Sequence, residues 1–206
     1  MDATTSFESA FFGKCGAWAN NQSVYGSSYG ALGVLDWIGD VGAYVNKDGA
    51  HGVGRALDIT AAGHANGFVD SNWSWRQGGS TDVRKYLGTA ALCRREVGNV
   101  LTRWFNTAHH DHIHIDDYRA AGPVDTTKQV DTTIVQAACN HLNNAGLVID
   151  GAWGTATENA YVALLDQFDM KCLDPKTNAS HARTFFGYIA AHCFKDQNAG
   201  YYQYSC

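Results

Sequence analysis

The stretches HGVGRALDIT (residues 51–60) and HHDHIHID (residues 109–116) decide how the first half of the chain folds. Leu57 to Thr60 is predicted to be a short buried strand that ends at the following Ala-Ala-Gly. His112 to Ile115 alternates polar and apolar residues, which predicts a second strand. Alternate residues of a strand share a face, so His112 and His114 point the same way. Two such strands can converge on one ion.

Histidine and aspartate are ligands that zinc favours, and a catalytic zinc site uses three protein ligands plus a water. Taken alone, His51 is more often an ordinary surface or buried histidine, and Asp58 is equally consistent with a strand-end cap. The second stretch is harder to explain by packing, because it places four histidines within six residues. The two stretches together therefore predict a metal site.

Both stretches match signatures of a known group. His51, Gly54, Ala56 and Asp58 resemble the H-x-x-G-x-A-x-D motif of the LAS metallopeptidases, and His112-Ile-His114 resembles their second motif, His-x-His. This group includes D-alanyl-D-alanine carboxypeptidases, murein endopeptidases and phage endolysins. Residues 86–118 also resemble the bacterial extensin-like C-terminal branch, and the whole resemblance covers roughly residues 15–118. The chain departs from the group at Gly49, where a serine is usual.

The resemblance implies a zinc peptidase in which His51, Asp58 and His114 hold the metal. It places the catalytic base three residues before the last ligand, at Asp111, while a subgroup uses histidines that match His109 and His112. Asp111 lies on the opposite face of an ideal strand from His114, so a bulge or the strand entry must bring it to the metal.

The remaining roles in the implied mechanism are less specific. Asp111 would take a proton and return it to the leaving amine, and His109 or His112 would stabilise the developing oxyanion. Asp116 is a candidate to orient a histidine, and a loop cap is an equal alternative. Three arginines are candidates for a substrate carboxylate, with solvated surface as the default for each: Arg55, Arg76 and Arg84.

Helical spacing covers much of the rest of the chain. Residues 83–105 are predicted to form one helix with its N-cap among residues 80–82, whereas residues 20–50 are ambiguous. After a Gly-Pro-containing segment at 121–128, three further helices are predicted. The first contains residues 134–142 and stops at Gly146, the second contains residues 160–168, and the third contains residues 182–193.

The second half resembles the three-helix type of peptidoglycan-binding domain. The match rests on the helix that ends at Gly146 and on the turn DGAWGTAT (residues 150–157) before a second helix. Thr157 is predicted as the N-cap of that helix, and Asp150-Gly151 as a tight turn. A generic helical hairpin with Trp153 in its core is the alternative.

These features predict an α+β protein. Its catalytic domain, residues 1–120, would hold a small antiparallel sheet flanked by helices. Residues 121–128 would be a linker, and residues 129–206 a small all-α wall-binding domain that is separable from the first. The expected function is zinc-dependent hydrolysis of a peptidoglycan peptide bond by a carboxypeptidase or an endopeptidase. A non-catalytic zinc-containing wall-binding protein and a zinc amidase are the alternatives.

Charge and hydropathy narrow the class of partner. The formal net charge of −5 argues against nucleic acid, and no apolar run approaches the ~20 residues that cross a bilayer. Peptidoglycan is the expected partner, the protein is expected to be a monomer, and Zn²⁺ is the expected cofactor.

Six cysteines without a Cys-x-x-Cys pair favour disulfides over a thiolate zinc site, and hence a secreted protein or one located in the cell wall. Cys15 and Cys93 are the only two in the first half and are predicted to pair, in line with the extensin-like resemblance. A free buried Cys93 is the alternative. The other four allow three pairings: Cys139, Cys172, Cys193 and Cys206.

Overall fold

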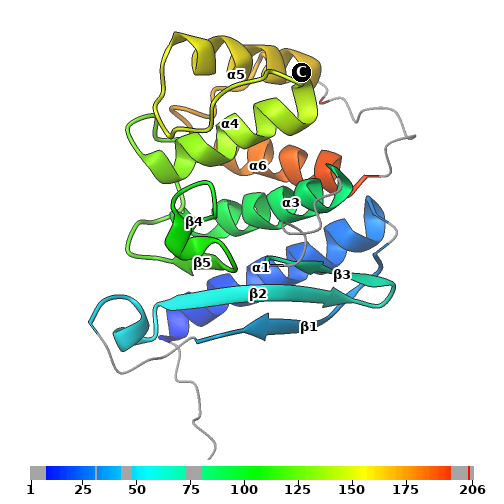
Figure 1. The fold of residues 1–206 in the computed structure, drawn as a ribbon, viewed down its shortest axis with the longest axis vertical. Coiled ribbons are helices and arrows are strands. Elements are labelled where there is room, and N and C mark those ends of the chain that lie inside the picture. The colour runs from blue at the N-terminus through cyan, green and yellow to red at the C-terminus, as the bar shows by residue number, and fades with distance from the viewer. Residues whose placement is uncertain (1–7, 31, 43–47, 73–79, 196–203, 205–206) are drawn as a thin grey trace, which may run out of the picture.

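The computed structural model describes residues 8–30, 32–42, 48–72, 80–195 and 204. The helices are α1 (Ser9–Ser28), α3 (Ser80–Glu96), α4 (Gln129–Asn143), α5 (Thr155–Gln167) and α6 (Ala179–Phe194). The strands are β1 (Leu35–Asp40), β2 (Ala56–His64), β3 (Gly67–Asp70), β4 (Asn99–Leu101) and β5 (Ile113–Asp116). Two 3-10 helices, η1 (His51–Val53) and η2 (Thr107–His109), flank the sheet. The α+β class is therefore confirmed (Figure 1).

The sheet is antiparallel and is built around β2. One edge of β2 pairs with β1, and the other edge pairs first with β5, along residues 56–59, and then with β3, along residues 61–64. Strand β4 extends the sheet beyond β5. The predicted end of the first strand at Ala61–Gly63 is wrong, because these residues continue β2 and pair with β3.

The two faces of the sheet have different chemistry. Leu57 and Ile59 of β2 and Ile113 and Ile115 of β5 are buried in the hydrophobic core. The residues between them point the other way, since side chains alternate along a strand. We call this second side, which carries Asp58 and His114, the outer face. The alternation of polar and apolar residues thus directs the predicted ligands away from the core.

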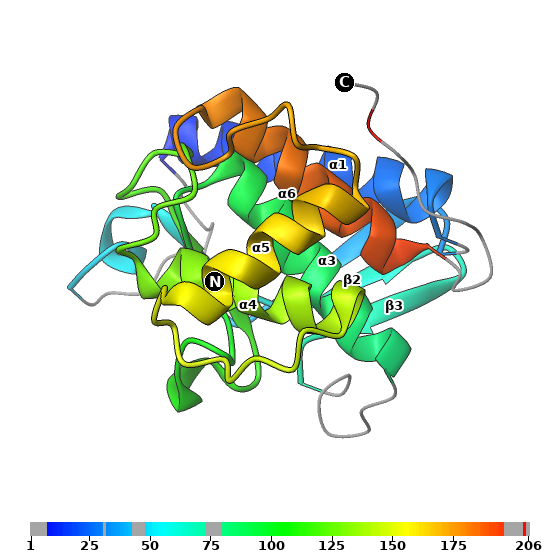
Figure 2. The same ribbon diagram turned by 90° about the horizontal axis from the view of Figure 1, so that it is seen from above.

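Helices cover the inner face in layers. Helix α1 and the sheet form the bottom layer, α3 and α6 the middle, and α4 and α5 the top (Figures 1 and 2). Helices α3 and α6 approach closely at Gly88, where an added Cβ would lie 2.9 Å from the Cβ of Cys193. No described helix is long and apolar enough to span a bilayer.

The core runs through both halves of the chain. One hydrophobic cluster includes Ile59 of the sheet, Leu87 of α3, Ile134 of α4 and Phe186 of α6. The predicted boundary at residues 121–128 therefore does not divide the core. The described residues from 129 onward contain α4, α5 and α6, in line with the three predicted helices, but α6 packs on α3 instead of forming a separate all-α body.

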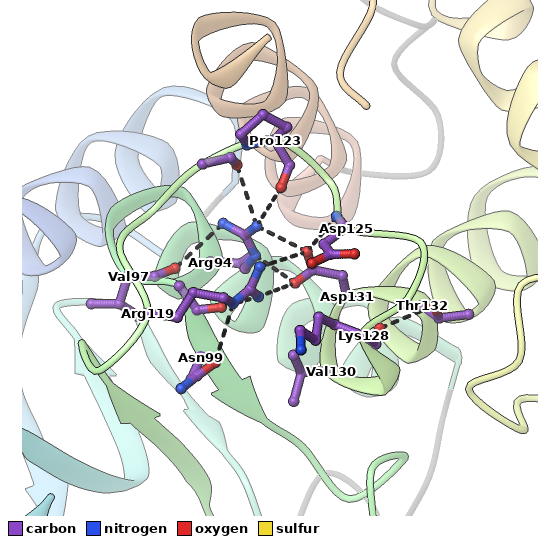
Figure 3. A network of polar contacts seen from close by, with 12 residues as sticks. Arg94, Val97, Asn99, Arg119, Pro123, Asp125, Lys128, Val130, Asp131 and Thr132 are labelled. Atoms are coloured by element: carbon purple, nitrogen blue, oxygen red, sulfur yellow. Dashed lines mark hydrogen bonds and ion pairs between the residues drawn. The ribbon is translucent and has the colours of Figure 1, made fainter. Parts of the chain in front are cut away.

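A buried ionic network joins the halves (Figure 3). Arg94 of α3 is 1% exposed and donates to both carboxylate oxygens of Asp131 in α4, at 2.7 and 2.9 Å. Arg119 donates to the same carboxylate. Arg94 also donates to the carbonyl oxygens of Gly122 and Pro123, so this segment is held against both helices.

Two sequence predictions need correction in the helical regions. Residues 97–105 do not continue α3, because the chain turns at Gly98 and residues 99–101 pair with β5. A side chain at Gly98 would collide with the carbonyl of Arg119. Thr157 is not an N-cap, since α5 begins at Thr155 after Gly154. Thr157 is instead buried beside Gln136, which donates to its hydroxyl at 3.1 Å.

Candidate metal centre

His51, Asp58 and His114, the metal trio hereafter, come together from three elements. His51 begins η1, which ends at Gly54 in a left-handed conformation (φ 69°) before the chain enters β2. That φ favours glycine, so the turn that returns His51 to the sheet depends on Gly54. Asp58 of β2 lies directly opposite His114 of β5 in the strand register. Among the residues that the structure describes, only this group of three or more could hold a metal ion.

The trio could hold a metal ion, and its donor separations can be compared with those of zinc ligands. His51 Nε2 lies 3.2 Å from His114 Nδ1 and 3.2 Å from Asp58 Oδ2, and His114 Nδ1 lies 2.8 Å from Asp58 Oδ1. Two ligands of a tetrahedral zinc ion with bonds of about 2.0–2.1 Å are about 3.3 Å apart. Two imidazole nitrogens and one carboxylate oxygen are also a donor set that zinc prefers.

Asp116 supports the trio from the far side of the His114 ring. Its Oδ2 lies 3.2 Å from His114 Nε2, and its Oδ1 accepts from Asn99 Nδ2 and from the Tyr118 amide. Asp116 thus orients a histidine and caps a turn at once. Burial acts to lower the pKa of His114, but the hydrogen bonds to Asp116 and Asp58 outweigh it and raise that pKa to about 9.

His112 faces the trio, and Asp111 faces His112. His112 Nε2 lies 3.7 Å from Asp58 Oδ1, and His112 Nδ1 lies 2.8 Å from Asp111 Oδ1. The hydrogen bond from His112 lowers the pKa of Asp111, whose side chain is 44% exposed. The entry of strand β5 brings Asp111 toward the site. Its carboxylate contacts the His112 ring and not the trio.

His109 lies at the rim beside His112 and His114, with ring centroids 5.1 and 5.8 Å away. Burial, followed by the nearby charges of His112 and His114, lowers its pKa to about 4. His109 Nδ1 lies 2.7 Å from Asn106 Oδ1, an oxygen that also accepts from the Ala108 amide. Because that oxygen is an acceptor, His109 donates from Nδ1, and its Nε2 carries a lone pair.

Two polar residues near the site were missed by the sequence analysis. Asn106 caps η2 and fixes the His109 ring, and an Asn three residues before a histidine was a detectable signal. Asp117 binds Lys14 of α1 at 2.6 Å and Arg55 at 2.7 Å, which ties α1 to the entry of β2. No local spacing marks Asp117, because Lys14 is far away in sequence.

The candidate arginines are differently placed. Arg55 is engaged by Asp117 and lies over the Tyr118 ring, next to the metal trio in sequence. Arg84 donates to the carbonyl oxygen of His192 in α6, on the helical side of the sheet. Arg76 lies outside the described residues.

The cysteines give a mixed result. Cys15 and Cys93 are free thiols, as are Cys139 and Cys193. The predicted disulfide between Cys15 and Cys93 is therefore absent from the structure, which shows the alternative of a free buried Cys93. Burial, followed by the charge of Cys15, raises the pKa of the Cys93 thiol. Cys172 is disulfide-bonded, and Cys206 lies outside the described residues.

A cavity of about 550 Å³ lies away from the metal trio, His109 and His112. The segment 119–126 forms one side of it, and Trp153, Glu158 and Lys176 line the other. Trp153 Nε1 donates to Glu158 at 2.7 Å, and its ring meets Tyr161 edge-on. Trp153 therefore belongs partly to the core and partly to a cavity wall.

No protein-family model matches this chain, and neither does any curated protein or any solved structure. The resemblance to the LAS peptidases thus depends on the residues of its two motifs alone.

Proposed function

We propose that this protein is a zinc-dependent hydrolase of peptide bonds in peptidoglycan stem or cross-link peptides, and that it acts outside the cell. The observation that carries the proposal is the metal trio. The two histidine nitrogens stand 3.2 Å apart, and each lies within 3.2 Å of one oxygen of the Asp58 carboxylate, so one ligand atom from each residue can meet at a metal ion. Three protein donors leave one position for a water or a substrate oxygen, which is the arrangement of a catalytic site.

His51, Asp58 and His114 would hold the metal, with Asp116 fixing the His114 ring. Bound zinc supplies a Lewis acid and a water of lowered pKa. The half-buried positions of Asp58 and His114 keep bulk water partly away from the reacting atoms, which strengthens electrostatic interactions there.

The geometry favours His112 over Asp111 as the proton acceptor. His112 donates from Nδ1 to the Asp111 carboxylate, so its Nε2 lone pair faces the trio. A general base must lie within reach of the proton that it abstracts. Asp111 would then act as the carboxylate that holds the His112 ring. His109, with its Nε2 lone pair at the rim, would accept a hydrogen bond from substrate in this tautomer.

The helical half would hold the wall polymer. Its resemblance to peptidoglycan-binding domains is supported by the turn at Asp150, where Oδ1 accepts from Gln136 and from the Ala152 amide. The cavity beside Trp153 offers an indole edge and charged side chains to such a ligand. Because α6 packs on α3, polymer held there would be kept at a fixed distance from the metal trio.

Digestion of purified peptidoglycan, followed by mass spectrometry of the released peptides, tests the proposal. A hydrolase of this class is expected to create new amino termini or to release a terminal D-alanine, and a chelator is expected to stop it. New termini at D-alanine, at diaminopimelate or at D-glutamate would each name a different bond. Wall binding without any released product would instead support the non-catalytic zinc protein.

Substitution of His112 by alanine is expected to lower kcat by about 10²–10⁴-fold while zinc stays bound, since general-base catalysis contributes that much. Asp111→Asn is expected to cost about 10–100-fold, the usual effect of a supporting residue at a metal site. His110→Ala is the matched control, because its side chain is 55% exposed and outside the trio. If Asp111→Asn is the more damaging change, Asp111 is the base.

A further inference from the structure

Two exposed aromatic side chains lie across the sheet from each other. Trp37 of β1 pairs with Gly63 of β2, and Gly63 pairs with Phe68 of β3. Directly paired residues of antiparallel strands point to the same face. Trp37 and Phe68 are each 53% exposed, although both are large apolar side chains on strands that pair with β2.

This aromatic pair lies on the outer face. Ala62 and Val69, which alternate with Gly63 and Phe68, are buried in the core, and His64 contacts Gln22 of α1. An added Cβ at Gly63 would lie 2.0 Å from Cε2 of Trp37, so the indole covers the place where a side chain would stand. The described helices pack on the opposite side (Figure 1).

The outer face connects the pair to the metal trio along β2. A register shift between Gly39 and Asp40 interrupts the strict alternation, so that Asp58 and Gly63 both face outward although they are five residues apart. At about 3.3 Å per residue, Gly63 stands roughly 16 Å from Asp58.

We propose that Trp37 and Phe68 form a sugar-binding platform for the glycan strand whose stem peptide enters the metal site. The inference rests on the function proposed above and adds the place of the substrate's sugar. A stem peptide of about four or five extended residues spans roughly 13–18 Å, which matches the distance along β2. The apolar face of a sugar ring covers an exposed indole or phenyl ring, while the indole N–H remains available to a polar group.

Charge selects this occupant over a lipid surface. Asp36, the neighbour of Trp37 in β1, is exposed, and a register shift between Leu35 and Trp37 lies at this residue. A carboxylate beside an aromatic pair repels anionic lipid headgroups, which attract basic segments instead. An N-acetylated sugar is neutral and tolerates this carboxylate.

The test compares two soluble substrates of the zinc-loaded full chain: a free stem peptide and the same peptide linked to its disaccharide. Trp37→Ala and Phe68→Ala are expected to lower kcat/KM on the linked substrate by about tenfold, which corresponds to about 1.4 kcal/mol, and to change it less than twofold on the free peptide. Phe12→Ala, an exposed aromatic of α1, is the control and is expected to change neither. Circular dichroism of each variant checks the fold.

A second arm measures the binding of N-acetylglucosamine oligosaccharide alone by isothermal titration calorimetry. Binding that is lost in Trp37→Ala supports the platform even if no substrate is hydrolysed, in which case only the proposed function fails. Equal effects of Trp37→Ala on both substrates overturn the platform and leave the function standing. Absent oligosaccharide binding, or binding to vesicles of anionic lipid that Trp37→Ala removes, also overturns it.

Discussion

Alanine at any one of His51, Asp58 and His114 is expected to reduce bound zinc from about one ion per chain to near zero and to abolish hydrolysis. Each residue supplies one of only three donor atoms, so its loss leaves an incomplete coordination shell. Zinc stabilises the transition state by several kcal/mol, and each 1.36 kcal/mol is a factor of ten in rate. A loss of about 10³-fold or more is therefore expected, measured by elemental analysis and turnover on the same preparations.

Matched variants separate metal loss from misfolding. Asp58→Asn preserves the shape of the side chain and removes its charge, and it is expected to lose zinc while keeping the wild-type circular dichroism spectrum. Asp116→Asn keeps all three donors and is expected to weaken zinc binding by about 10–100-fold only. Stoichiometric zinc in all three alanine variants would remove the trio as the metal site.

Much of this centre could be predicted from sequence because its information is local. The alternation of His112 to Ile115 determines which side chains face outward, and the spacing from His51 to Asp58 allows one turn before a strand. The role of Asp111 could not be predicted in the same way. Whether its carboxylate reaches the metal or the adjacent His112 ring depends on the backbone at the strand entry, where no repeating pattern applies.

The ends of β2 and α3 depend on contacts with other parts of the chain, which local sequence patterns do not reveal. Ala61 to Gly63 resemble the end of a strand when considered alone, but β3 pairs with them and extends β2. Residues 99–101 keep helical spacing with α3 and still pair with β5, because Gly98 redirects the chain. In both places a tertiary contact overrides the local pattern.

The relation of the two halves was the least predictable feature. Periodicity shows that α3 and α6 each have an apolar face, but not that the two faces meet. The close approach at Gly88 and the ionic network between α3 and α4 are pairings of residues far apart in sequence. A segment rich in small polar residues at 121–128 resembled a linker, whereas its carbonyls are bound by Arg94.

Replacement of Asp131 by alanine is expected to destabilise the protein by about 3–5 kcal/mol, the usual cost of leaving a buried charge without its partner. Arg94 is 1% exposed and would keep its charge without the carboxylate. Total stabilities of about 5–15 kcal/mol make this a large share. Urea unfolding of the full chain measures it. Asp166→Ala is the control, because the Asp166–Lys171 pair is exposed and is expected to contribute about 0–1 kcal/mol.

The effect of Asp131 is also expected to depend on pH. Burial acts to raise the pKa of Asp131, but hydrogen bonds from Arg94 and Arg119 outweigh it and lower the pKa below its ordinary value. A carboxylate with a lowered folded-state pKa stabilises the fold above its unfolded pKa of about 3.9 and loses that contribution as the pH falls through the folded value. The stability difference between wild type and Asp131→Asn should therefore be largest near neutral pH and shrink below about pH 4. A difference that stays constant from pH 7 to pH 3 would show that Asp131 acts through packing alone and that its ion pairs do not stabilise the junction of the two halves.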